Sequence, residues 1–214
     1  MNQARARDTV VIAASAGGIE ALRDLLSALP PEFPAAVLLV LHVPAAGGRA
    51  LPHILIRAGR LPASTATDGE DALAGHIYVA PPDRHILLMD GMIRLSSGPR
   101  LNGHRPAADP LFISAAKAKG PRLIAVVLSG ALDDGAVGCA AVERRGGLVL
   151  VQDPADSAYE GMPRAAIAAT RHPVVLPLGD LGAALDREVR APAPAAPPEP
   201  DPELDRQLAV YLGP

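Results

Sequence analysis

Short apolar runs alternate along the chain with segments whose apolar residues recur at helical spacing. Continuous apolar runs are typical of parallel strands buried on both faces, because helices cover such a sheet on both sides. We expect strands at residues 9–14, 36–41, 77–80, 122–128, 148–152 and 174–176, and helices at 19–29, 51–58, 109–119, 135–145, 163–169 and 178–189. The pattern predicts an α/β fold with a doubly wound, mostly parallel sheet and helices on both faces.

Two further apolar segments, 85–89 and 92–95, flank the dipeptide Asp90-Gly91. This dipeptide favours a two-residue turn, so we expect a β-hairpin at the edge of the sheet. Asp109-Pro110 is a sequence typical of a helix start, with Asp as the N-cap and Pro as the first helical residue.

The composition changes after residue 190, which divides the chain into three parts. Residues 1–190 are expected to form one domain, and the Pro- and Ala-rich stretch 191–202 a semi-rigid linker. The tail, 203–214, is compatible with a frayed end or with a short amphipathic helix carrying Leu204 and Leu208. As a helix, the tail would be a docking segment for a partner.

Composition and charge exclude several classes of protein. Of 214 residues only five are aromatic (3 Tyr, 2 Phe), and the net charge is -3, which argues against nucleic-acid binding. No apolar run reaches the roughly 18 residues of a membrane span, and the run after Arg7 is shorter than a signal peptide requires. The single cysteine, Cys139, excludes an internal disulfide and a multi-cysteine metal site. We therefore expect a cytoplasmic protein without membrane insertion.

Polar residues that follow the predicted strands are the candidates for chemistry, because ligands of open α/β sheets bind at the carboxyl ends of the strands. Ser15 follows the first strand, His42 the second, and Asp133 and Asp134 come after the strand at 122–128. A serine hydroxyl becomes a good nucleophile when a base takes its proton, and an imidazole can serve as that base. A carboxylate next to the imidazole orients the ring. These residue types predict a nucleophilic triad.

Glycines next to Ser15 suit a substrate that approaches the backbone closely. The N–H groups of Ala16 and Gly17 lie at a helix start, where they would face a developing oxyanion. The alternatives are structural: Ser15 as a helix cap, His42 as a hydrogen-bonded core histidine, and Asp134 as a turn residue. Dinucleotide and Walker motifs are absent and the other histidines lack ligand spacing, so neither metal nor organic cofactor is expected.

The sequence resembles the catalytic domain of the chemotaxis protein-glutamate methylesterases, the CheB family. Six segments carry the resemblance, in the same order along the chain: AASAGGIEAL (13–22), LHVP (41–44), GHIYVAP (75–81), NGHRP (102–106), LSGALDDGA (128–136) and GMPRAA (161–166). Any one of these segments alone is a weak signal, whereas the ordered set is specific.

The resemblance assigns Ser15 as the nucleophile, His42 as the general base and Asp134 as the orienting acid. It implies hydrolysis of glutamate methyl esters on chemoreceptor helices, and some members of the family also deamidate receptor glutamines. It adds the N–H of Ala131 to the oxyanion candidates. His104 and Arg105 become candidate substrate-binding residues, with a structural role as the alternative for Arg105.

Departures from the family concern the substrate more than the chemistry. Ala16 replaces the usual Thr, Ala131-Leu132 the usual Met-Gly, and the loop at 44–49 lacks the usual aromatic residue. The usual N-terminal receiver domain does not precede the first strand, so we expect a stand-alone form with a receiver or methyltransferase partner in trans. A non-catalytic binding module that kept this fold is the alternative function, although the retained serine, histidine and aspartate favour an enzyme.

Overall fold

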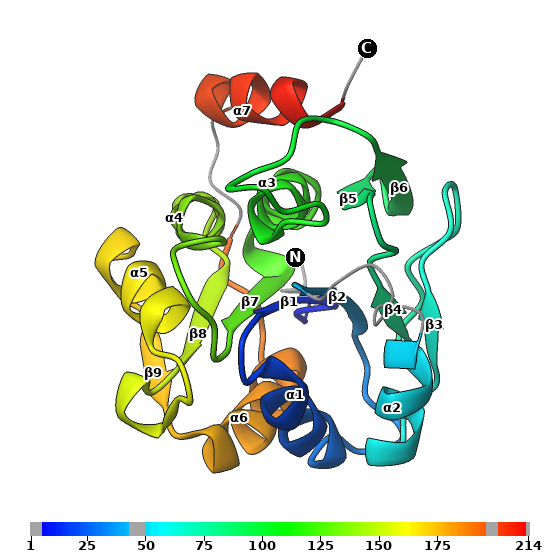
Figure 1. The fold of residues 1–214 in the computed structure, drawn as a ribbon, viewed down its shortest axis with the longest axis vertical. Coiled ribbons are helices and arrows are strands. Elements are labelled where there is room, and N and C mark those ends of the chain that lie inside the picture. Colours follow the sequence, from blue (N-terminus) through cyan, green and yellow to red (C-terminus); the bar gives the residue numbers. More distant parts are fainter. Residues whose placement is uncertain (1–5, 43–49, 196–200, 213–214) are drawn as a thin grey trace.

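A seven-stranded parallel sheet forms the middle layer of the computed structural model, which describes residues 6–42, 50–195 and 201–212 (Figure 1). The strand order is β3-β4-β2-β1-β7-β8-β9, and every neighbouring pair is parallel. The strands are β1 (Thr9–Ala14), β2 (Ala36–Leu41), β3 (Ala63–Thr65), β4 (Ile77–Val79), β7 (Leu123–Val127), β8 (Leu148–Gln152) and β9 (Val174–Leu176). The predicted doubly wound sheet is confirmed.

Helices cover both faces of this sheet, and the pleat of the strands divides the core between the two faces. One face carries α1 (Gly18–Ser27), α2 (Leu51–Ala58) and α6 (Leu178–Arg190), and the other carries α3 (Ala108–Lys119), α4 (Ala136–Arg144) and α5 (Gly161–Ala169) (Figure 1). In β1, Val11 and Ala13 pack toward α3 and α4, while Val10 and Ile12 pack toward α1. A strand buried on both sides explains the unbroken apolar run.

The predicted hairpin is present as β5 (His85–Met89) and β6 (Met92–Ser96). Asp90 and Gly91 both have positive φ, 52° and 86°, as a tight hairpin turn requires. The hairpin lies against α3 as a two-stranded sheet of its own, while β3 and β9 form the edges of the larger sheet. Because β5 is buried, packing against α3 covers apolar surface that an edge position would expose.

The C-terminal segment forms helix α7 (Pro202–Leu212), which packs on α3 of its own domain (Figure 1). Leu204 and Leu208 are buried there, and Ser96 Oγ donates a hydrogen bond to the Tyr211 carbonyl. Residues 196–200 of the predicted linker and 213–214 of the tail lie outside the described residues. The apolar face of α7 is thus covered within the chain.

The start of α3 differs from the prediction for Asp109. The helix begins at Ala108, and its N-cap residue, Ala107, has no side chain that can accept a hydrogen bond. Asp134, from the loop after β7, supplies the cap: its Oδ2 accepts from Ala108 N at 2.6 Å and its Oδ1 from Asp109 N at 3.2 Å. A residue distant in sequence satisfies the free N–H groups, so the helix needs no local cap.

Asp109 in turn caps α4, the helix that follows Asp134. Its Oδ1 accepts from Gly138 N at 2.7 Å, while the N-cap of α4, Gly135, has no side chain. Burial, and then the negative charge of Asp134, raise the pKa of Asp109 to about 7. The two aspartates therefore fix the starts of two neighbouring helices reciprocally.

The crossing of α3 and α4 depends on Gly138, because a Cβ there would lie 2.4 Å from the Phe112 Cβ. We expect Gly138→Ala to lower the free energy of unfolding by about 1–3 kcal/mol through overpacking. Gly179→Ala in α6 is the matched control, since nothing lies within 4 Å of its Cβ position, and it should gain up to about 1 kcal/mol from helix propensity. Urea unfolding measures both, and equal effects of the two variants would contradict the packing argument.

The raised pKa of Asp109 predicts a pH-dependent stability. Because the folded pKa of about 7 exceeds the ordinary value of 3.8, this carboxyl destabilises the fold increasingly as pH rises through that interval. Asp109→Asn keeps an acceptor for Gly138 N and cannot ionise. Its melting temperature relative to wild type should be higher at about pH 8 than at about pH 5. A difference independent of pH would show that Asp109 does not take up a proton on folding.

Candidate active site

Ser15 and His42 directly follow the carboxyl ends of two adjacent parallel strands, β1 and β2. The register of β1 and β2 pairs Ala14 with Leu41, so the residues that follow these two also lie side by side. His42 N donates to the Ala14 carbonyl at 3.1 Å, which extends the pairing by one step. The loop at 44–49, where the sequence departs from the family, lies outside the described residues.

His42 and Asp134 form a buried hydrogen-bonded pair. The distance from His42 Nε2 to Asp134 Oδ2 is 2.7 Å, and each side chain is only 5% exposed. Burial acts to raise the pKa of Asp134, but the hydrogen bonds from His42 and Ala108 outweigh it and hold the pKa below its ordinary value. In the neutral tautomer that donates Nε2–H to an ionised Asp134, Nδ1 is the nitrogen that can accept a proton.

The backbone around Ser15 is held by the loop after β7. Ser15 N donates to the Ser129 carbonyl at 3.0 Å, and Gly18 N donates to the Ser15 carbonyl at 2.9 Å. A Cβ on Gly130 would lie 3.0 Å from the Ser15 Cβ and 2.2 Å from the Met162 sulfur, so only glycine allows this close approach. Within the described residues no hydrogen bond joins Ser15 Oγ to His42.

Several backbone N–H groups before α1 and in the loop after β7 have no partner within the described part of the protein. Among the described residues, no acceptor receives the N–H of Ala16, Gly17 or Ala131. Gly17 has φ of 71°, a conformation that glycine adopts readily, and Ser129 Oγ fixes the turn by donating to the Ala16 carbonyl at 2.8 Å. The arrangement offers N–H donors beside Ser15, as stabilisation of an oxyanion requires.

His104 lies against His42, a contact that sequence reasoning missed. The ring centroids are 4.2 Å apart and the rings are nearly parallel, at 3°. Burial, and next the charge of His42, lower the pKa of His104, which favours a neutral ring in the stack. The spacing of these histidines along the chain gives no signal for the stack, because they are 62 positions apart and only the folded chain brings them together.

Arg105 has partners within the protein. Its guanidinium donates to Asp83 Oδ1 at 2.8 and 3.1 Å and to the carbonyls of Ser97 and Gly98 at 2.7 and 2.8 Å. These bonds occupy the donors that would bind a substrate carboxylate. These internal partners favour the structural role of Arg105, and its candidate role in substrate binding stays a prediction.

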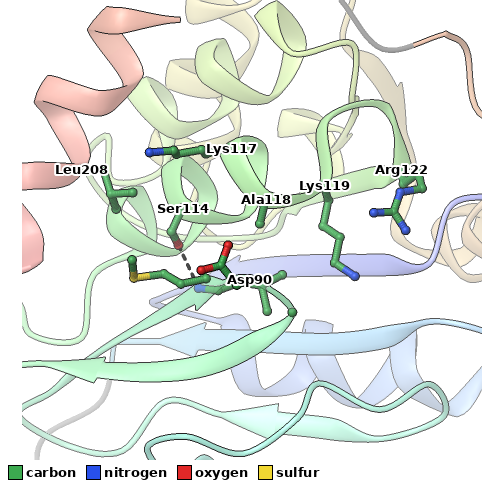
Figure 2. A pocket seen from close by; sticks show the side chains of 10 residues that line it. Asp90, Ser114, Lys117, Ala118, Lys119, Arg122 and Leu208 are labelled. Carbon is green, nitrogen blue, oxygen red and sulfur yellow. Dashed lines mark hydrogen bonds between the residues drawn. The ribbon is translucent and has the colours of Figure 1, made fainter. Parts of the chain in front are cut away.

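A pocket of about 450 Å³ lies between the β5–β6 turn and the end of α3 (Figure 2). Its cations are already paired, Lys119 and Arg122 with Asp8, and Lys117 with Asp205. None of Ser15, His42 and Asp134 lines this pocket. It is therefore separate from the strand ends that carry the candidate chemistry.

Within the described ranges, no three His, Cys, Asp or Glu side chains gather closely enough to hold a metal ion. Cys139 is buried, and burial raises the pKa of its thiol, so the thiol is not a ready nucleophile. No helix in these ranges has the length and apolar character needed to cross a membrane.

Comparison with known proteins relates the chain to one family. The family model described as CheB methylesterase matches residues 10–185. A protein-glutamate methylesterase/protein-glutamine glutaminase of Myxococcus xanthus is 40% identical over 85% of this chain and 52% of its own length. A relative with the same description from Anaeromyxobacter dehalogenans is also 40% identical, over 83% of this chain and 52% of its own length.

A solved structure supports the same relationship. The CheB methylesterase catalytic domain of Thermotoga maritima superposes with a TM-score of 0.81 at 32% identity, covering 84% of this chain and 97% of that domain. The chain spans about half the length of the curated relatives it matches. The family match, the sequence relatives and the shared fold together show that the chain belongs to the CheB methylesterase family.

Proposed function

We propose that this chain hydrolyses methyl esters of glutamate side chains on a protein substrate, with Ser15 as the nucleophile and His42 as the base. The observation that carries the proposal is the buried 2.7 Å hydrogen bond between His42 and Asp134, next to the strand end that bears Ser15. A structural histidine would need neither an ionised buried partner nor a neighbouring serine at the same sheet edge.

The reaction would proceed in two halves. In the first, His42 Nδ1 takes the proton of Ser15 Oγ as this oxygen attacks the ester carbonyl, and the N–H groups of Ala16, Gly17 and Ala131 stabilise the oxyanion. The imidazolium then gives its proton to the leaving methoxide, which departs as methanol. In the second half, His42 deprotonates a water that hydrolyses the acyl-serine, which frees the glutamate carboxylate and restores Ser15.

Asp134 would act through His42. Its carboxylate holds the proton on Nε2 and stabilises the imidazolium that forms in each half-reaction. Because Ala108 N and Asp109 N bind the same carboxylate, Asp134 is oriented by the start of α3 rather than by His42 alone. The stacked ring of His104 limits rotation of the imidazole, which supports a positioning role beside its candidate role in substrate binding.

The relatives' names favour a second reaction at the same residues. They pair methylesterase with glutaminase activity, and amide hydrolysis uses the same acyl-serine with ammonia as the leaving group. The substrate class we propose is a chemoreceptor-type protein that carries methylated glutamates. A receiver or methyltransferase partner in trans stays a prediction.

Removal of the nucleophile tests the proposal directly. Ser15→Ala should lower methanol release from a methylated receptor fragment by about 10⁴-fold or more, as loss of the serine does in other triads. Ser27→Ala, at the other end of α1 with an exposed side chain, is the control and should leave the rate unchanged. Equal rates for wild type and Ser15→Ala would remove the assigned nucleophile.

A fluorophosphonate probe separates the enzyme from the alternative of a non-catalytic module. The probe should modify Ser15 in wild type and in Ser27→Ala, because reaction needs only an activated serine and oxyanion donors. A serine that stays unmodified while the protein forms a stable complex with the receptor fragment would favour the module.

An imidazole base also predicts a pH dependence. Methanol release should increase from acid to neutral pH, because only an unprotonated His42 can accept the serine proton. Initial rates under kcat/KM conditions across this range provide the measurement, with the folded fraction checked at each pH. A flat profile would exclude His42 as the base.

A further inference from the structure

Leu132 combines an unfavourable backbone conformation with an exposed apolar side chain. Its φ is 63°, in the left-handed region that bulky residues rarely adopt and that glycine favours. Its side chain is 63% exposed, so it gains little from packing within the protein. Such outliers concentrate at ligand-binding segments, where contact with a ligand compensates for the strain.

The backbone of Leu132 is fixed in place although its side chain is exposed. A Cβ on Gly161 would lie 2.8 Å from the Leu132 nitrogen, so the first residue of α5 packs directly against Leu132. Gly130 joins the same two segments, since its N donates to the Tyr159 carbonyl at 3.0 Å and its carbonyl accepts from Met162 N at 2.9 Å. The side chain of Leu132 is therefore presented from a rigid loop.

Tyr159 is a second exposed apolar side chain beside the same serine. It is 52% exposed, and its Cδ2 lies 3.5 Å from the position of a Cβ on Gly17, two residues after Ser15. The loop of Leu132 approaches Ser15 itself, since a Cβ on Gly130, two residues before Leu132, would lie 3.0 Å from the Ser15 Cβ. We call Leu132 and Tyr159 the apolar lip of the site.

The acidic residues next in sequence to the apolar lip already have partners within the protein. Glu160, next to Tyr159, pairs with Arg164 at 2.8 Å, and Asp133, next to Leu132, accepts from Asn102 Nδ2 at 2.9 Å. Leu132 and Tyr159, by contrast, offer exposed apolar surface to a ligand.

We propose that the apolar lip binds an apolar side chain of the substrate protein next to the esterified glutamate, and so determines which esters are hydrolysed. The inference rests on the proposed function. A methyl ester is small and uncharged and supplies little binding free energy, so recognition of the surrounding protein must come from contacts beside the reacting group.

The test compares a protein substrate with a small reagent at the same serine. Leu132→Asn keeps a residue that tolerates positive φ and removes the apolar contact. It should lower kcat/KM for methanol release from a methylated receptor fragment by about tenfold or more. The rate of Ser15 modification by a small fluorophosphonate should stay within about twofold of wild type, because that reagent carries no neighbouring side chain for the apolar lip to bind.

Two variants complete the design. Leu132→Gly should show the same selective loss, because it also lacks the side chain while relieving the backbone. Leu73→Asn replaces a leucine of matched exposure, 62%, and should change neither rate.

An unchanged kcat/KM in Leu132→Asn would overturn the proposed role of the apolar lip. Equal losses with the receptor fragment and with the fluorophosphonate would also overturn it, because they would indicate damage to the loop after β7. A wild-type protein that releases no methanol would instead overturn the proposed function and, with it, the lip.

Discussion

The carboxylate of Asp134 is the point on which the site depends. It accepts hydrogen bonds from His42 Nε2, Ala108 N and Asp109 N, which come from the end of β2 and the start of α3. A buried charge that loses its hydrogen-bond partners destabilises a protein strongly, so the carboxylate of Asp134 favours folds of the chain in which these three groups stay together. The hydrogen bond to Asp134 also holds the imidazole of His42 at the carboxyl end of β2, next to the end of β1 that bears Ser15.

Asp109 extends this constraint to a second helix. Two buried carboxyls close together cannot both be charged without a cost in free energy, and their surroundings shift the two pKa values in opposite directions. Asp134 is stabilised as a carboxylate by His42 and α3, whereas burial and the neighbouring charge raise the pKa of Asp109 to about 7. The catalytic geometry we propose and the packing of α3 on α4 therefore share one set of hydrogen bonds.

Rigid backbone surrounds Ser15, and the variable features lie at its rim. Glycine at 130 allows the loop after β7 to touch the Ser15 Cβ, and the segment before α5 is bonded to that loop. Exposed side chains such as Leu132 and Tyr159 project from these fixed segments. Such a division lets the chemistry stay constant while the contacts to a protein substrate change.

The sequence alone determined the parallel sheet, because strands buried on both faces appear as unbroken apolar runs. It also determined the polar residue types that follow the strands: Ser15 and His42 come directly after such runs, and Asp134 comes after a short loop. It did not determine that the β5–β6 hairpin and helix α7 both pack on α3. Nor did it determine the capping of α3 by Asp134 or the stacking of His104 on His42. Each of these depends on surfaces or hydrogen-bond donors supplied by segments far away in the chain. Local patterns describe what a residue can do, whereas its partner is decided only when the layers pack.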